Sequence, residues 1–356
     1  MKVYLSHSKK MDYINELYNP IKEAFFLKEE FYFPHEKSAE NLNGFDYYKQ
    51  FDVVVAEVSH TGTGIGIELG FAYALNIPII CFYKKGTKYA NSLNSVTDKF
   101  FEYDSIDDFL FKLYIVIEKR YHLTIMGLYH MLGIPEHLGK HMLDTAAVCY
   151  LIASNIVTSK YNLMNIENIF GKVVTSFDRI KYLNEESTLV KEMLLHDVGN
   201  LIKLQPYEIE TDLTRWIRDY LDKKSNGDEH LATDFICKLF YFTDEQIERL
   251  NLKNLENCVN VANSNDICVK IEAYADQRVS SNGVVSLEEG LKELKNIHSK
   301  DPKATLYGKK VDKIIEAAFK NEEQIFEVCK LTKEDINKET IEQISKELET
   351  FGIWEN

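Results

Sequence analysis

The sequence lacks the features that mark a disulfide-linked, zinc-ribbon or membrane-spanning protein. None of its six cysteines stands in a Cys-x-x-Cys pair, so we expect buried thiols rather than disulfides or a zinc ribbon. No apolar run reaches the roughly 20 residues that span a bilayer, and the N-terminus lacks the apolar segment of a signal peptide. These absences predict a cytoplasmic protein with no membrane contact.

Positive charge is also in short supply. The chain has 42 lysines and arginines against 56 aspartates and glutamates, which gives a net charge of −14 at pH 7. This balance argues against a broad nucleic-acid-binding surface, although a local basic cluster could still bind a small phosphorylated ligand. At 356 residues the chain is long for one hydrophobic core, so we expect two domains.

The first of these, residues 1–121, alternates between short β-favouring segments and segments with helical spacing. Strands are predicted at residues 2–5, 31–33, 52–58, 77–83 and 99–103, and helices at 11–27, 46–51, 68–75 and 106–120. This alternation predicts an α/β domain with a doubly wound parallel (flavodoxin-like) sheet. Its site should lie beyond the carboxyl ends of the strands.

A glycine-rich segment surrounds Glu68. It is neither a P-loop nor a dinucleotide fingerprint, because Leu69 stands where the third glycine would be required. Such a cluster is more often a flexible connection before a helix. However, a carboxylate in the first turn of a helix is held ionised by the positive helix end. Placed beside Gly64 and Gly66, an ionised Glu68 would suit a nucleophile at a sugar C1′.

Three segments of this domain resemble the nucleoside 2-deoxyribosyltransferase family, and most closely its branch that hydrolyses (deoxy)nucleoside 5′-monophosphates. They are DVVVAEVS at 52–59, GIGIELGFA at 64–72 and PIICFY at 78–83. The resemblance implies that Glu68 attacks C1′ and releases the base, and that Tyr4 orients this glutamate. It also implies that Ser6, Ser8 and Lys9 face the phosphate.

Two further positions follow from the same resemblance. Ser92 falls near a serine that a partner subunit lends to the site, which implies a homodimer or a higher homo-oligomer. The family's sugar-binding aspartate corresponds to Gly44, and Asp46 is the nearby carboxylate. The opening residues, YLSHS at 4–8, also resemble Toll/interleukin-receptor-like domains, some of which cleave NAD.

The second domain, residues 122–300, reads as helical after a link at 123–133. An apolar run carries His196 and Asp197 into the interior, where desolvation costs several kcal/mol unless the groups are paired or metal-bound. A core histidine bonded to a carboxylate would be the default for this pair alone. Together with His141 and Asp276 on other helical segments, the pair predicts one divalent metal ion. Two imidazoles and two carboxylates suit Mn, Fe, Ni, Co or Zn and tolerate Mg.

This pattern resembles the HD-domain metal-dependent phosphohydrolases. The likeness lies in IPEHLGKH at 134–141, LLHDVGN at 194–200 and ADQR at 275–278. It implies that the domain hydrolyses phosphate esters and that Asp197 is a catalytic residue. His230 falls where relatives carry an additional histidine, or is simply solvent-facing. Lys203 and Arg278 are candidate phosphate clamps or ordinary helix charges. Gly199 is expected to let the backbone turn.

Residues 301–356 are charged and amphipathic, and they read as a helical extension of the second domain, a lid or a dimer surface. For the whole chain we expect a bifunctional hydrolase that acts on small nucleotides with a divalent metal. Two alternatives stay open at this point. One is a sensor whose first domain binds a nucleotide or an NAD-like ligand without chemistry and regulates the second. The other is a signalling phosphodiesterase for cyclic or oligomeric nucleotides.

Overall fold

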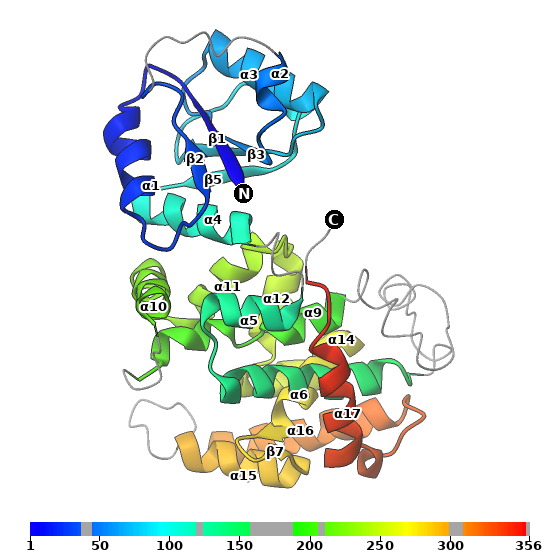
Figure 1. The fold of residues 1–356 in the computed structure, drawn as a ribbon. Helices are drawn as coiled ribbons and strands as arrows, with labels where there is room; N and C mark the ends of the chain where they lie inside the picture. Colours follow the sequence, from blue (N-terminus) through cyan, green and yellow to red (C-terminus); the bar gives the residue numbers. More distant parts are fainter. Residues whose placement is uncertain (37–44, 119–123, 157–187, 206–210, 299–308, 354–356) are drawn as a thin grey trace. The chain divides into compact units, whose positions relative to one another are not determined.

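The computed structural model describes residues 1–36, 45–118, 124–156, 188–205, 211–298 and 309–353. It divides into two compact units, Met1–Glu118 and Lys119–Asn356 (Figure 1). Within the described residues, no helix combines the length and apolar character needed to cross a membrane. All six cysteines are free, and five of them are buried, as expected.

The first unit is built on a five-stranded parallel sheet with strand order β2-β1-β3-β4-β5 (Figure 1). The strands are β1 (Lys2–His7), β2 (Glu30–Tyr32), β3 (Val53–Glu57), β4 (Ile79–Lys84) and β5 (Phe100–Tyr103). Between them lie a π-helix (Ile14–Tyr18), α1 (Asn19–Glu23), α2 (Phe45–Tyr48), α3 (Thr63–Ala74) and a 3₁₀ helix (Asn91–Ser95), and α4 (Ile106–Glu118) follows β5. This topology confirms the predicted α/β class.

Side chains alternate between the two faces of this sheet. Every residue of β3 is buried, as expected for a central parallel strand that is covered on both sides. Tyr4 and Val54 belong to the core cluster on the side of α3, together with Leu69 of that helix. On the side of α4, Phe82 packs edge-on against Phe109 with ring centroids 5.0 Å apart.

Helix α3 begins five residues earlier than the sequence predicted. It runs from Thr63, so Gly64 and Gly66 lie inside the helix and Glu68 is its sixth residue. The field of a helix end falls off within the first turn. The prediction that the helix end holds Glu68 ionised is therefore wrong, and the electrostatic state of this carboxylate is set by other neighbours.

The second unit is largely helical. Its elements before the hairpin are α5 (Ile125–Leu132), α6 (Glu136–Ala153), α9 (Thr188–Leu195), a 3₁₀ helix (Val198–Lys203), α10 (Asp212–Ser225), α11 (Glu229–Leu239), α12 (Asp244–Leu252), a 3₁₀ turn (Leu255–Asn257), α13 (Cys258–Asn263) and α14 (Ile267–Gln277). The hairpin strands β6 (Val279–Ser280) and β7 (Gly283–Val284) follow, and then α15 (Leu287–His298), α16 (Lys309–Phe326), a 3₁₀ turn (Lys333–Asp335) and α17 (Lys338–Leu348).

The segment predicted as a link is in fact the helix α5. It begins at a Thr124 side-chain cap and ends at Gly133, whose φ of 69° is the left-handed conformation that favours glycine. Among the helices of this unit, α6 packs against α9, α14 and α17, while α16 packs against α13 and α14. The C-terminal helices therefore belong to the same compact unit as the candidate metal ligands.

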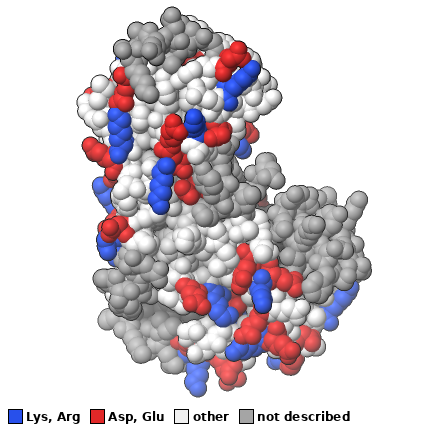
Figure 2. Space-filling view, in the orientation of Figure 1, with Lys and Arg blue, Asp and Glu red and all other residues white. Residues whose placement is uncertain are grey.

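Charged side chains of both signs are interspersed on the face drawn in Figure 2.

Two carboxyl groups lie inside the second unit, where Glu192 on α9 and Glu272 on α14 are fully buried. Arg249 donates to both oxygens of Glu192, at 2.9 Å from Nε and 2.6 Å from Nη2. Its Nε also lies 3.6 Å from Glu272 Oε1, but neither oxygen of Glu272 receives a hydrogen bond. Arg249 is thus the positive charge near both buried carboxyl groups, but it forms hydrogen bonds only with Glu192.

We expect Glu272→Gln to stabilise the folded chain at neutral pH by about 1 to 3 kcal/mol, because the glutamine is neutral in this buried site without having to take up a proton. Burial and the nearby Glu192 raise the pKa of Glu272 well above its ordinary value. The folded chain therefore binds this proton more tightly than the unfolded chain, and stability falls as pH rises above the unfolded value. Glu272→Gln should remove that part of the pH dependence, as measured by urea unfolding between pH 5 and pH 8.

Two variants serve as controls in the same measurement. Glu192→Gln weakens the bidentate pair and should cost about 3 kcal/mol. Glu323→Gln, at an exposed position on α16, should leave stability within about 0.5 kcal/mol. A loss of stability in Glu272→Gln as large as that in Glu192→Gln would show that Glu272 is ionised and needed by Arg249.

Candidate functional site

The adjacent pair His196 and Asp197 lies between two helices. Helix α9 ends at Leu195, and Asp197 is the residue before the 3₁₀ helix Val198–Lys203. The two residues therefore lie outside both helices. Tyr129 of α5 donates from its hydroxyl to the Leu194 carbonyl at 2.6 Å, which fixes the backbone just before the pair.

Gly199 has a different role from the one predicted. Its φ is not positive, so no turn requires it. Instead, a Cβ at this position would come within 2.0 Å of the Glu229 carbonyl oxygen and 2.5 Å of the Thr233 nitrogen. The glycine is therefore needed because α11 packs directly against the backbone that follows His196 and Asp197.

The four predicted ligands converge from three separate segments of the second unit. Asp276 Oδ1 lies 3.4 Å from His141 Nε2 and 3.2 Å from His196 Nε2. Asp197 contributes Oδ2 at 3.8 Å from His141 Nε2 and Oδ1 at 3.7 Å from His196 Nε2. The ligand atoms of His141, His196 and Asp197 all lie within 4.8 Å of one another. These three residues form a candidate metal site.

The spacing and the donor chemistry both fit a divalent metal ion. Ligand atoms about 2.0 to 2.2 Å from one ion are separated from each other by about 3 to 3.5 Å, close to the contacts with Asp276. His196 Nδ1 lies 2.6 Å from the Met193 carbonyl oxygen, which can only accept, so Nδ1 carries the proton. In the neutral ring Nε2 then presents a lone pair toward Asp276 Oδ1, a contact that only a proton or a metal ion can make favourable.

Two residues that the sequence analysis missed complete the surroundings of the site. Lys253, which follows α12, places its ammonium 3.1 Å from Asp197 Oδ1 and 3.4 Å from Asp276 Oδ2. Asn200 donates to Asp197 Oδ2 at 2.9 Å. Lysine is usually a surface residue, and Lys253 is 56 positions from Asp197, so no local pattern announced it.

The charges of the site act strongly on one another. Burial alone would raise the pKa of Asp197, but Lys253 and His196 lower it to about 2. Lys253 and His196 likewise hold the pKa of Asp276 well below its ordinary value despite burial. Burial lowers the pKa of His141, yet the carboxylates of Asp276 and Asp197 outweigh it and raise that pKa overall. The site therefore holds two ionised carboxylates.

The other predicted residues of this unit lie apart from the cluster or are engaged elsewhere. His230 is half-exposed near the start of α11, with Nε2 3.9 Å from Glu229 Oε1. Lys203 pairs with the same Glu229 carboxylate. Arg278 is buried, and its guanidinium donates to the carbonyls of Val285 at 2.5 Å and Ile336 at 2.9 Å. These bonds direct the Arg278 side chain to the interior, so it is not placed as a phosphate clamp.

In the first unit, strand alternation places Tyr4 and Ser6 of β1 on the same side of the sheet as α3. Tyr4 Oη donates to Glu68 Oε1 at 3.0 Å, and Ser6 Oγ donates to Glu68 Oε2 at 2.5 Å. Both carboxyl oxygens are thus held. Burial raises the pKa of Glu68, and the bonds from Ser6 and Tyr4 oppose that rise only in part.

A cavity of about 640 Å³ lies beside Glu68, at the carboxyl end of β1. Its lining includes Ser8 and Lys9 of the loop after β1 and Gly64 of α3. Residues that the sequence analysis did not single out also line it: His7, Lys10, His35, Thr61, Gly62, Thr63 and Ile65. His7 is buried and neutral, because burial lowers its pKa to about 4. A pocket of hydroxyls and two lysines thus adjoins the held carboxylate.

Five predicted residues of this unit are not among those lining the cavity. Two of them, Tyr4 and Ser6, bond to Glu68, and the other three lie elsewhere. Asp46 is exposed on α2 and pairs with Lys49 at 2.6 Å. Gly66 is exposed inside α3, and Ser92 is exposed in the 3₁₀ helix Asn91–Ser95. The position Gly44 lies outside the described residues.

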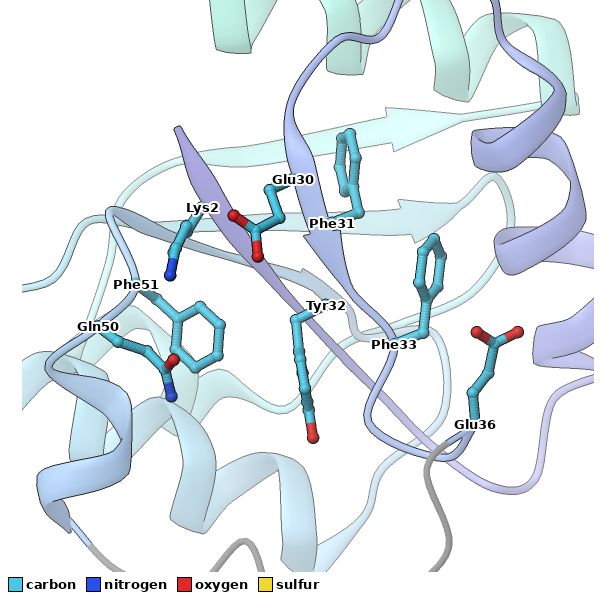
Figure 3. Close-up of a pocket in the computed structure, with 8 residues that line it drawn as sticks. All are labelled: Lys2, Glu30, Phe31, Tyr32, Phe33, Glu36, Gln50 and Phe51. Atoms are coloured by element: carbon cyan, nitrogen blue, oxygen red, sulfur yellow. The ribbon is translucent and has the colours of Figure 1, made fainter.

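A second, smaller pocket of about 130 Å³ lies by the edge strand β2 (Figure 3). Phe51, Gln50 and Lys2 gather on one side of it, near Tyr32, and Glu36 lies at the opposite end. None of the predicted site residues lines this pocket, so it is not part of the candidate site.

Comparisons with protein-family models, with curated proteins and with solved structures gave no match for this chain.

The metal site predicts binding of Mn²⁺ that depends on pH. A protonated imidazole cannot ligate a metal, so affinity should fall as pH drops through the raised pKa of His141, and binding should release protons. Titration calorimetry in buffers of different ionisation enthalpy measures both effects. His141→Ala and Asp197→Ala should each weaken binding at least about 100-fold.

His230→Ala is the matched control, because this histidine lies outside the cluster. It should bind Mn²⁺ as the unmodified chain does. Equal binding by His141→Ala and the unmodified chain would rule out the site as described.

Proposed function

We propose that the chain is a nucleotide-processing hydrolase with a metal-dependent phosphohydrolase site in its second unit. The observation that supports this most directly is the convergence of His141, His196 and Asp197 from α6 and the segment after α9. We further propose Asp276 of α14 as the fourth ligand, since its Oδ1 faces both imidazoles. The ion would be Mn, Fe, Ni, Co, Zn or Mg, according to the donor set.

The protein's own residues have clear tasks in such a reaction. When bound, a divalent cation supplies Lewis-acid chemistry, polarising a phosphoryl oxygen and favouring deprotonation of water. His196 is oriented for ligation by the Met193 carbonyl, and Asp197 is held by Asn200 and Lys253. The side chains of His141, Asp197 and Asp276 are 25%, 23% and 24% exposed. This exposed side is where a phosphate ester would enter.

For the first unit we propose cleavage of the N-glycosidic bond of (deoxy)nucleoside 5′-monophosphates. In this step an oxygen of the Glu68 carboxylate bonds to C1′, the C1′–N bond breaks, and the base leaves with the electron pair and takes up a proton. Water then adds at C1′ and restores the carboxylate. Tyr4 and Ser6 hold the attacking group, and Ser8 and Lys9 would face the phosphate.

The proposed activity of the second unit can be tested by measuring phosphate release from a panel of nucleotides. With Mn²⁺ present, Asp197→Asn should reduce turnover by about 100-fold or more, because a metal ligand and its charge are lost. Glu68→Gln should leave phosphate release unchanged, and excess chelator should abolish it. Phosphate release that survives both Asp197→Asn and chelator would contradict the proposal.

Chromatographic detection of free base tests the first unit. Glu68→Gln should lower base release on the order of 10³-fold or more, as loss of a nucleophile does in other covalent mechanisms. Tyr4→Phe should cause a smaller loss, because Ser6 still holds one oxygen. Neither chelator nor Asp197→Asn should affect this reaction.

Burial raises the pKa of Glu68 and so disfavours the ionised form that a nucleophile needs. This favours a second candidate function, a nucleotide sensor. In that case the unmodified chain would bind a nucleoside monophosphate in calorimetry without releasing base. Glu68→Gln would bind it equally well. Base release by the unmodified chain would exclude the hypothesis that this unit is only a nucleotide sensor.

A further inference from the structure

Lys253 is the one member of the metal cluster that carries a permanent positive charge of its own. It lies at the end of α12, and its side chain is only 6% exposed. Its ammonium contacts Asp197 Oδ1 at 3.1 Å and Asp276 Oδ2 at 3.4 Å. The cluster therefore contains a lysine that bonds to both carboxylates at once.

The two oxygens of Asp276 point to different cation positions. Oδ1 faces the imidazoles of His141 and His196, while Oδ2 faces Lys253. A carboxylate that bridges two metal ions divides its oxygens in the same way, one for each ion. Here the second position is filled by an ammonium group that belongs to the chain.

We propose that Lys253 is a built-in counter-ion of the metal centre, which holds both carboxylates in place without metal and limits the centre to one divalent cation. This inference rests on the metal centre of the proposed function. It would explain why the site binds a single ion, and why its two carboxylates are already in position before the metal binds.

The physical argument is one of charge balance. Two ionised carboxylates in a partly buried cluster repel each other and lose hydration, so they need a cation nearby. Lys253 provides it at all times. The same ammonium opposes a divalent ion that binds on its side of the carboxylates, and it weakens binding on the imidazole side by charge repulsion.

Lys253 acts on the carboxylates and not on a substrate. Its ammonium lies on the buried side of the cluster, whereas His141, Asp197 and Asp276 form the exposed side. It is thus a positioning residue, and the informative readouts are metal affinity, metal stoichiometry and stability.

The full-length chain should be titrated with Mn²⁺ under equilibrium dialysis and examined by electron paramagnetic resonance. We expect one Mn²⁺ per chain, with the spectrum of an isolated ion. In excess chelator the chain should stay folded, with only the modest fall in melting temperature that loss of a bound ligand causes. Lys253→Met removes the charge but keeps a long side chain. It should bind Mn²⁺ at least about tenfold more tightly, because the repulsion is gone, and its melting temperature should fall sharply in chelator.

Lys270→Met is the matched control. Lys270 is also a buried lysine, but its ammonium donates to the carbonyls of Val261 and Ala262, away from the cluster. This variant should lose stability without any change in Mn²⁺ affinity or in the effect of chelator. If Lys253→Met cannot be purified without metal, refolding with Mn²⁺ should recover it and should not recover Lys270→Met.

The outcomes separate the two hypotheses. No Mn²⁺ binding by the unmodified chain would overturn the metal centre and the inference together. One Mn²⁺ per chain with weaker or unchanged binding in Lys253→Met would leave the metal centre standing and overturn the counter-ion role. Two coupled Mn²⁺ ions in the unmodified chain would also overturn it.

Discussion

The second unit is organised around the need to keep carboxylates ionised inside a helical bundle. Asp197 and Asp276 are balanced by Lys253 and by two imidazoles, and each carboxylate oxygen faces a positive or polar neighbour. A second set of charges lies one helical turn away along α14, where Glu272 precedes Asp276 by four residues and so shares its helix face. The interior of this unit therefore holds two neighbouring layers of charged side chains. Lys253 compensates the carboxylates of one layer, and Arg249 those of the next.

The two layers differ in how completely they are compensated. Asp276 accepts a bond from Lys253 and contacts His196, while Glu272 has no hydrogen bond to either oxygen. A fully compensated carboxylate is ready to act as a ligand. An uncompensated one is more easily kept neutral. The contrast explains why two acidic residues on one helix face have pKa values displaced in opposite directions.

The sequence was informative where a pattern is local and periodic. Alternating strands and helices predicted the parallel sheet, with strand bounds that differ from the structure by two residues or fewer. The order of His141, His196, Asp197 and Asp276 predicted a cluster, and the fold brings these four side chains together. In the first unit, period-two alternation along β1 explains why Tyr4 and Ser6 both reach Glu68.

Features set by distant packing were not predictable in this way. The start of α3 was misjudged because glycines weaken a helical pattern without excluding a helix. Lys253 and His35 reach their sites only through the tertiary fold, and neither stands in a motif. Arg278 looked like a surface cation, but its partners Val285 and Ile336 come from later segments. In each case the deciding contact joins residues that no short window of sequence contains.

The bonds of Arg278 connect the C-terminal segments to the candidate metal site. This arginine follows α14 directly, two positions after Asp276, and it is bonded to a carbonyl just before α17. Tyr274, two positions before Asp276, donates its hydroxyl proton to Glu322 of α16. The helical turn that carries Asp276 is thus held on one side by α16 and on the other by the segment just before α17. A premature stop codon ahead of α16 would therefore disturb the candidate metal site, although it would delete none of its residues.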